Sequence, residues 1–419
     1  MTSEPIGILA AGGEVPVEVA KQIVHNSGSV FIVGIDANTS HDIAIFPHAR
    51  ISLGQLGKML ALFRQHHCRR LVIVGSLSRP DILKLRLDFG VLLNLPAVLS
   101  MLKGGDDQVL RRVVGFFEAQ GFEVVGIPDV APGLIADRGT LAGAEPTASE
   151  QQDAIVGYEL IHKLGPLDIG QAVVIDDGCV RAIEGVDGTD AMLGRLVSAQ
   201  ASLVRRGTLI KAAKPGQELR VDLPTIGPAT VAACDKAGLK RITVEAGRSV
   251  IVQRETTFAE ANRTGIGVWG LPATVKKSAP VNCATPLQAA NLACLTSLRA
   301  AEKHLADAVK GLAAIRVLQG YNAAPSVIVA RQHILAVNVA EPYGAFIERA
   351  VSLRQWGGKG RHKREGLMVL SSLGGITGAH LKTLASARFA GLAIERGETV
   401  SHELLTIAEY HGLFIVEHA

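Results

Sequence analysis

Short apolar runs alternate with helically spaced segments along the first third of the chain. The runs are "IGILAAGG" (6–13), "VFIVGID" (30–36), "RLVIVGSLSRP" (70–80) and "FEVVGI" (122–127). Continuous apolar runs of this length indicate strands that are buried on both faces. The segments between them, such as residues 14–26, repeat apolar residues at helical spacing. This alternation predicts an α/β fold with a doubly wound parallel sheet over residues 1–137.

Two segments rich in small and polar residues divide the remainder of the chain. Residues 138–150 and 271–285 have this composition, and we interpret both as linkers. They separate a second α/β domain at 151–270 from a third unit at 286–419. Helical spacing of apolar residues from 287 to 318 predicts a long helix at the start of the third unit.

The third unit repeats the apolar pattern of the second. The segment "AVVIDDGCVRAIEGVDGTDAMLGRLVS" (172–198) aligns without gaps with "SVIVARQHILAVNVAEPYGAFIERAVS" (326–352), and the same offset of 154 residues aligns Asp153 with Asp307. Agreement in order, spacing and apolar pattern predicts an internal duplication. The alternative is a chance likeness between two α/β units. We interpret residues 286–419 as a degenerate copy of the second domain.

The two copies differ in their charged residues. Glu184, Asp187 and Asp190 align with Asn338, Glu341 and Gly344. The segment "KPGQELRVDLPTIG" (214–227) has no counterpart in the copy, where "LGGIT" (373–377) remains in its place. A packing role would keep apolar residues in both copies, whereas a chemical role that is needed once would leave its charges in one. This asymmetry predicts that residues 214–227 are functional and that the copy is non-catalytic.

Glycine-rich turns follow or flank predicted elements of the N-terminal domain. In an open α/β sheet, ligands bind at the carboxyl ends of the strands, where backbone N–H groups can hold phosphate. We therefore expect a site for phosphate or a nucleotide in "ILAAGGEVP" (8–16), "GSLSRP" (75–80) and "LKGGDDQ" (102–108). Its predicted substrate-binding residues are Gly12, Gly13, Ser76, Ser78, Arg79 and Lys103. The alternative for each segment is a tight turn or a helix cap.

Three carboxylates surround two glycines in "AIEGVDGTDAML" (182–193). Clustered carboxylates repel one another unless a cation joins them, and Mg²⁺ binds few protein oxygens while leaving room for phosphate. Asp187 and Asp190 are therefore candidate metal ligands, and Thr189 is a candidate substrate-binding residue. The alternative is that Thr189 or Asp190 caps the following helix.

The segment at 214–227 combines cations with a carboxylate. Lys214 and Arg220 can neutralise a diphosphate, and Asp222 can hold a metal or orient a water molecule. The alternative is an exposed loop with one helix cap. The predicted catalytic residues are Asp222, Lys214 and Asp190, and the predicted metal ligands are Asp222, Asp187 and Asp190.

Composition excludes several classes of protein. The 43 Lys and Arg residues nearly balance the 39 Asp and Glu residues, which argues against nucleic-acid binding. Five scattered Cys without a CxxC motif indicate free thiols in a reducing compartment. The first residues lack the basic region of a signal peptide, and no apolar run is long enough to span a membrane. We expect a cytoplasmic protein.

Six segments in their order along the chain resemble the LpxI-type UDP-2,3-diacylglucosamine diphosphatases of Gram-negative bacteria. They are "GILAAGGEVP", "LGQLGK", "GSLSRP", "KGGDD", "AIEGVDGTDAM" and "KPGQELRVDLPTIGPAT". The resemblance covers about residues 1–270, the length of a whole family member. It implies Mg²⁺-dependent hydrolysis of UDP-2,3-diacylglucosamine to lipid X (2,3-diacylglucosamine 1-phosphate) and UMP in lipid A biosynthesis. It also implies attack of water on the phosphate at the sugar side, substrate between two domains, and an essential aspartate at Asp222.

The lipidic substrate implied by this resemblance suggests transient contact of a peripheral enzyme with the inner-membrane surface. Residues 271–419 depart from the family pattern. Our hypothesis is that the C-terminal copy packs against the first copy in place of a partner subunit's domain, or that it mediates oligomerisation. Two other functions remain open from the sequence: a sugar-nucleotide transferase, which would release UDP, and a non-catalytic sensor of UDP-sugars.

Overall fold

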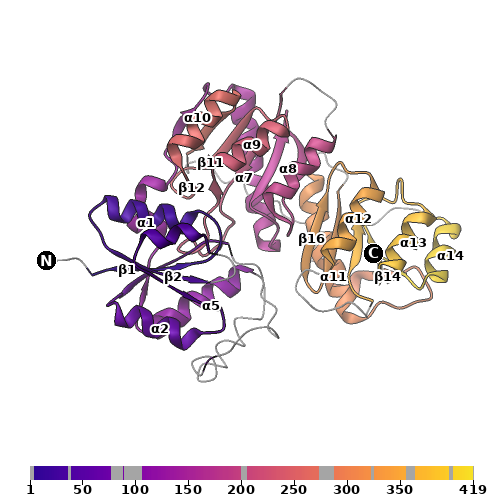
Figure 1. Cartoon of the computed structure of the whole chain (residues 1–419). Coiled ribbons are helices and arrows are strands. Elements are labelled where there is room, and N and C mark those ends of the chain that lie inside the picture. The colour runs from indigo at the N-terminus through magenta and orange to yellow at the C-terminus, as the bar shows by residue number, and fades with distance from the viewer. Residues whose placement is uncertain are drawn as a thin grey trace. The chain divides into compact units, whose positions relative to one another are not determined.

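The computed structural model describes residues 4–35, 39–76, 88, 106–199, 205–272, 287–321, 325–354, 364–395 and 400–418. The chain forms two compact units, each built from segments that are distant in sequence. Unit 1 comprises Met1–Gly143, Gly216–Val231 and Val244–Ala273, and unit 2 comprises Ala144–Pro215, Ala232–Thr243 and Thr274–Ala419. Figure 1 labels their elements. None of the helices in the described ranges is both long and apolar enough to cross a membrane.

The first sheet of unit 1 is parallel, as the sequence predicts. Its strands are β1 (Ile6–Ala10), β2 (Val30–Ile35), β3 (His48–Ile51), β4 (Arg70–Val74) and β5 (Glu123–Val124). They lie in the order β3-β2-β1-β4-β5, and every pair is parallel. The main helices packed with this sheet are α1 (Val15–His25), α2 (Leu56–Gln65) and α5 (Asp106–Ala119). The doubly wound α/β fold predicted for the N-terminal domain is therefore confirmed.

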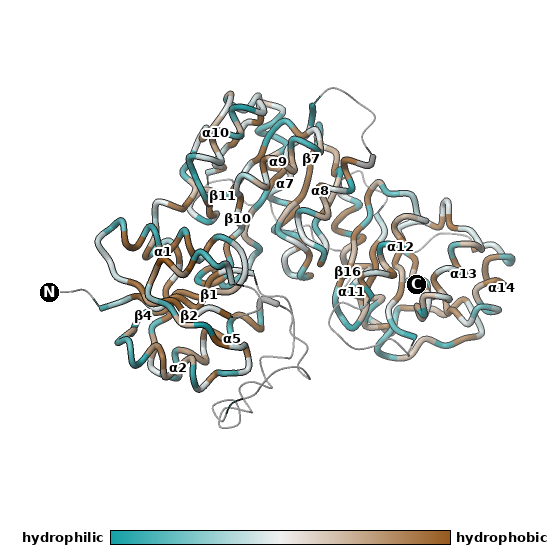
Figure 2. The backbone as a smooth tube through the Cα atoms, in the orientation of Figure 1, coloured by the Kyte–Doolittle hydropathy of each residue, from teal (hydrophilic) through white to brown (hydrophobic). Residues whose placement is uncertain are grey.

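Separate apolar cores cover the two faces of this sheet. Ile8 packs in one core with Val19 of α1. Leu9, the next residue of β1, packs in the other with Phe63 of α2 and Phe117 of α5. Successive side chains of a strand point to opposite faces, so a strand covered on both sides must be apolar throughout. Figure 2 shows this property as the brown trace of β1 and β4.

The second domain contributes a mixed sheet that begins inside the predicted linker. Its strands are β6 (Gly139–Ala142), β7 (Ala172–Asp176), β8 (Cys179–Ile183), β9 (Thr208–Lys211), β11 (Arg241–Glu245) and β13 (Gly267–Leu271). Among the described residues their order is β6-β13-β11-β9-β7-β8. Residues 138–150 are therefore not a plain linker, because β6 pairs antiparallel with β13 there. The helices of this part are α7 (Ala148–Leu164), α8 (Gly188–Ala199), α9 (Pro228–Lys236) and α10 (Arg254–Thr264).

The C-terminal part contains a sheet with the same strand order. Its strands are β14 (Leu292–Cys294), β15 (Ser326–Ala330), β16 (His333–Asn338), β17 (Leu367–Leu370), β18 (Gly391–Ile394) and β19 (Phe414–His418). Where the structure describes them, they lie in the order β14-β19-β18-β17-β15-β16. If the six strands of each sheet are numbered one to six along the chain, both sheets have the order 1-6-5-4-2-3. The accompanying helices are α11 (Glu302–Gln319), α12 (Tyr343–Leu353), α13 (Gly378–Ser386) and α14 (His402–Tyr410). The helix predicted from residue 287 is wrong in its first part, where β14 precedes α11.

A buried aspartate fixes the first hairpin in the second domain and in the C-terminal part. Asp153 of α7 accepts hydrogen bonds from the backbone N–H groups of Asp177 (3.1 Å) and Gly178 (2.7 Å) in the β7–β8 turn. At the same offset of 154 residues, Asp307 of α11 accepts from Arg331 (3.0 Å) and Gln332 (2.6 Å) in the β15–β16 turn. This shared detail supports the interpretation of residues 286–419 as a copy.

The β7–β8 turn gives a testable difference between two glycines. Gly178 has φ +75°, whereas Gly194 lies within α8, and a Cβ at either position would meet no atom within 4 Å. Gly178→Ala therefore isolates the cost of a left-handed backbone, and we expect it to destabilise the protein by about 1 kcal/mol. Gly194→Ala should instead stabilise it by up to about 1 kcal/mol, because alanine favours helix. Urea denaturation measures both, and a stability gain in Gly178→Ala would contradict the assigned turn.

Candidate functional site

The first sheet has its switch point between β1 and β4. The chain passes from β1 through α1 to β2 on one side, and β4 lies on the other side. Ligands of open α/β sheets bind outside the carboxyl ends of the strands at such a point. Gly12 follows β1 and Ser76 follows β4, and each donates its N–H to the other's carbonyl oxygen at 2.8 and 2.9 Å. The structure thus brings together two residues that the sequence predicts to bind substrate.

Gly13 connects this point to the start of α1. It pairs with Thr39 and has φ +89°, and α1 begins two residues later. The side chain of Glu14 does not cap the helix; its Oε2 accepts a hydrogen bond of 2.7 Å from Gln253. The first N–H groups of α1 therefore lie beside the Gly12–Ser76 bridge, and helix N-termini favour anions.

The turn after β4 requires glycine for two reasons. Gly75 has φ +102°, and a Cβ there would lie 2.6 Å from the carbonyl oxygen of Gly12. Any side chain would separate Gly12 from Ser76. The predicted binding residues Ser78, Arg79 and Lys103 lie outside the described residues.

The segment that carries Asp222 is anchored in the cores of unit 1. Leu219 and Leu223 pack in the core that includes α1, and Val221 packs in the core that includes α2 and α5. A freely solvated loop would leave such side chains exposed, so this alternative is wrong for residues 216–223. The short strands β10 (Thr225–Ile226) and β12 (Val250–Ile251) pair in parallel just after it.

Polar contacts tie the same segment to α5. Arg220 forms ion pairs with Glu218 (2.8 Å) and with Glu118 of α5 (2.7 Å). Arg111 of α5 donates to the carbonyl oxygen of Gly216. The hydrogen bond from Arg220 holds the pKa of Glu218 below its usual value. Arg220 therefore anchors the loop through two carboxylates, which is a better account of its contacts than the expected neutralisation of a diphosphate.

Asp222 is partly exposed, and its carboxylate has a defined partner. The Nε2 group of Gln217 donates to Oδ2 of Asp222, and the Asp222 N–H donates to the Glu218 carbonyl oxygen at 3.0 Å. Gln217 is itself buried, so it can orient the carboxylate. Gln217 is neutral and lies five positions before Asp222, so the pattern of charged residues gives no sign of it.

Lys214 is held by a carboxylate that the sequence did not indicate. Its Nζ lies 2.7 Å from Oδ1 of Asp168, and its side chain is 11% exposed. A Cβ on Gly165 would meet Pro215 at 2.6 Å, so the backbone beside Lys214 is closely packed. This ion pair fixes the start of the 214–227 segment, and the catalytic role of Lys214 stays a prediction.

The carboxylates around residues 184–190 have separate partners. Glu184 accepts hydrogen bonds from the Thr189 hydroxyl and the Gln171 N–H, each at 2.7 Å. Asp187 forms an ion pair with Arg195 of α8, and Asp190 is exposed. The substrate-binding role of Thr189 and the catalytic role of Asp190 stay predictions.

Asp187 forms an ion pair with Arg195, and its role as a metal ligand stays a prediction. The partly exposed arginine would compete with a bound cation for the oxygens of this carboxylate. The sequence contained the signal, because the acid and the arginine eight residues later recur in the copy as Glu341 and Arg349. An acid–arginine pair that occurs in both segments indicates a structural role. Among the residues with described side chains, no group of three or more His, Cys, Asp or Glu is arranged to hold a metal.

Comparison with known proteins places these features in a family. Residues 5–134 match the LpxI N-terminal domain, and residues 137–269 match the LpxI C-terminal domain. The UDP-2,3-diacylglucosamine pyrophosphatase LpxI of Caulobacter vibrioides is 36% identical over 271 residues, which cover 64% of this chain and 97% of that protein. The chain belongs to the LpxI family. Both the switch-point glycines and Asp222 lie within the part that matches LpxI, whereas residues 286–419 lie beyond the two family domains.

Proposed function

We propose that this protein hydrolyses UDP-2,3-diacylglucosamine to lipid X and UMP in lipid A biosynthesis. The match to nearly the whole length of a pyrophosphatase of that substrate carries the proposal. The anchored Asp222 segment supports it, because core packing and the buried Gln217 amide hold one carboxylate in a fixed position.

The proposed nucleotide and diphosphate end of the substrate binds at the switch point of the first sheet. The first N–H groups of α1, reached through Gly12 and Gly13, would donate to phosphate oxygens. Ser76 is held at the same point by its backbone bridge to Gly12. Ser78, Arg79 and Lys103 complete the proposed set by sequence.

The proposed metal is Mg²⁺, with Asp222 as its protein ligand. Mg²⁺ commonly uses one or two carboxylates together with water and substrate phosphates, so one oriented carboxylate fits such a site. Bound there, the ion would polarise a phosphoryl oxygen and offset charge that develops in the transition state. Gln217 would keep one carboxylate oxygen of Asp222 in position. Asp187 and the exposed Asp190 remain proposed further metal ligands by sequence.

The proposed reaction is a single displacement at the phosphorus on the sugar side. A water oxygen forms a bond to that phosphorus, the bond to the bridging oxygen breaks, and UMP leaves with the bridging oxygen. One proton of the attacking water is released to solvent, and the other stays on the phosphate of lipid X until it equilibrates with solvent. The oxygen from water therefore ends in lipid X.

The C-terminal copy is proposed to be non-catalytic and to pack on the first copy. It has no counterpart of residues 214–227, and Gly344 stands where the first copy has Asp190. Because the substrate carries two acyl chains, we also propose transient contact of the enzyme with the surface of the inner membrane.

One assay tests both the proposed hydrolysis and which phosphorus atom the water attacks. Purified protein is incubated with UDP-2,3-diacylglucosamine in ¹⁸O-labelled water, with Mg²⁺ or with EDTA. We expect UMP and ¹⁸O-labelled lipid X with Mg²⁺ and a large loss of rate with EDTA. Release of UDP would instead indicate a transferase, and binding without turnover in any divalent metal would indicate a sensor. Label in UMP would overturn the proposed direction of attack.

A further inference from the structure

Two parts of unit 2 have the same strand order, and they contact each other through elements at matching positions. Strands β8 and β16 are equivalent, and each is the last strand of its sheet in the described order. They approach closely, and the Val186 N–H just after β8 donates to the Leu335 carbonyl oxygen of β16 at 3.4 Å. Helices α7 and α11 are also equivalent and in contact, with Nζ of Lys163 donating to the Tyr321 hydroxyl at 2.9 Å beyond the end of α11.

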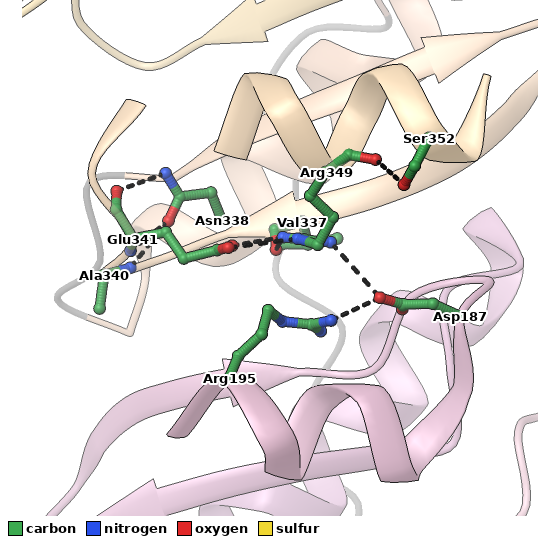
Figure 3. A network of polar contacts seen from close by, with 8 residues as sticks. All are labelled: Asp187, Arg195, Val337, Asn338, Ala340, Glu341, Arg349 and Ser352. Carbon is green, nitrogen blue, oxygen red and sulfur yellow. Dashed lines mark hydrogen bonds and ion pairs between the residues drawn. The ribbon is translucent and has the colours of Figure 1, made fainter. Parts of the chain in front are cut away.

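Equivalent ion pairs face each other beside these strands. Asp187 pairs with Arg195 in the first copy, and at the offset of 154 residues Glu341 pairs with Arg349 in the second. Figure 3 shows Arg349 extending from α12 toward Asp187, and its Nη1 lies 4.0 Å from Oδ2 of Asp187. Burial, followed by the charge of Arg349, lowers the pKa of Arg195, and the charges of Asp187 and then Glu341 oppose this shift. Two arginines and two carboxylates thus form one mostly buried cluster.

Backbone and apolar contacts also join the two copies beside this ion-pair cluster. Val186 packs against the core of the C-terminal copy. A Cβ on Gly185 would lie 3.0 Å from the Leu335 carbonyl oxygen, so glycine permits the observed approach. The face therefore combines an apolar contact with the core of the C-terminal copy and a close backbone contact. Two surfaces that touch only loosely would show neither.

We infer that residues 286–419 occupy the place of a second protomer in a twofold homodimer of the first copy. In a twofold interface the same surface patch serves both sides, so each element meets its own counterpart or its neighbours. Here β8 meets β16, α7 meets α11, and the Asp187–Arg195 pair meets the Glu341–Arg349 pair. A domain of different origin would have no reason to present equivalent elements. The partner that this face fits is therefore a second copy of the same domain, supplied within one chain.

Cutting the folded chain tests whether the contact is an interface in solution. A protease recognition sequence is inserted between residues 279 and 280 of the full-length protein. After cleavage we expect the two pieces to co-elute in size-exclusion chromatography at micromolar concentration. Val186→Asp places a charge against the C-terminal core and should separate the pieces. Val197→Asp is the matched control, because Val197 is 44% exposed on α8, and it should leave them together. Separation of the unsubstituted pieces would overturn the inference.

Double-mutant cycles on the uncut chain test its twofold character. One cycle combines Asp187→Ala with Arg349→Ala, and the other combines Arg195→Ala with Glu341→Ala. We expect each cycle to show a coupling of at least about threefold in the unfolding equilibrium constant. Coupling in neither cycle, or in one cycle alone, would contradict an interface built from the same patch on both sides. Circular dichroism of each variant confirms that it folds, and a variant that does not fold is replaced by the corresponding Asn or Gln substitution.

Discussion

Asp222→Asn is expected to lower kcat by about 10³-fold while leaving the protein folded. The side chains have the same shape, and the asparagine Oδ1 can still accept the hydrogen bond from Gln217 that now reaches Asp222. Leu219, Val221 and Leu223 still hold the segment in the two cores of unit 1. The substitution therefore removes the negative charge with little change of structure. Steady-state rates with UDP-2,3-diacylglucosamine measure the loss.

Glu118→Gln is the matched control for this prediction. It removes a carboxylate that contacts the same segment through Arg220, but this ion pair is half exposed and should contribute little to stability. We expect its kcat to stay within about twofold of the unsubstituted enzyme. If Asp222→Asn also stayed near the unsubstituted rate, Asp222 would not be the metal ligand or the water-orienting group. Weaker Mg²⁺ activation in Asp222→Asn would favour the metal role.

Arg241→Ala is expected to lower the free energy of unfolding by about 3 kcal/mol. Arg241 is 2% exposed and donates from Nε and Nη2 to Oε2 of Glu150, at 3.2 and 3.1 Å. Glu150 is buried and also forms an ion pair with Lys240 at 2.8 Å. Without Arg241, the buried Glu150 carboxylate keeps too few positively charged partners. The resulting loss of stability exceeds the net stabilisation that the intact ion pair provides. Urea denaturation followed by circular dichroism measures the change.

The pH dependence provides an internal check on this prediction. Burial alone would raise the pKa of Glu150, but Lys240, the Thr147 N–H and Arg241 together hold it below its ordinary value of 4.5. The stabilisation from Glu150 is therefore present above pH 4.5 and is lost as the pH falls through the lower folded-state pKa. The penalty of Arg241→Ala should accordingly shrink in that acidic range. An equal penalty at all pH values would show that lost packing, and not lost charge compensation, causes it.

Arg206→Ala is the control for this buried pair. Arg206 forms an ion pair with Asp176 in unit 2, but its side chain is 59% exposed. Solvent screens such a pair, so we expect a change below about 1 kcal/mol.

The parallel sheet and its binding edge were predictable from the sequence because local patterns determine them. Runs that are apolar throughout required strands covered on both faces, and glycine after β1 and β4 required turns at one edge. The meeting of Gly12 with Ser76 follows from these two facts. The family resemblance and the position of Asp222 followed from motifs that are continuous along the chain.

The sequence failed where a residue's role depends on distant partners or on very short strands. Asp168 beside Lys214 lies 46 residues away along the chain, and no local pattern links them. Strands β6 and β14 were both missed, one read as a linker and the other as a helix. Both are the first strand of their sheets in sequence and have only four and three residues, so pairing with a distant strand decides their conformation.

The facing ion pairs bear on how this chain can change over time. In an assembly of identical chains, one substitution at the twofold contact alters both sides at once. A residue whose charge is reversed therefore faces a partner whose charge is reversed too. With both halves encoded in tandem, each side can vary alone. Aspartate at 187 against glutamate at 341 is such a divergence, and it keeps both arginines paired. The half that carries residues 214–227 can then keep its sequence while the other half drifts, provided that the contact between them is preserved.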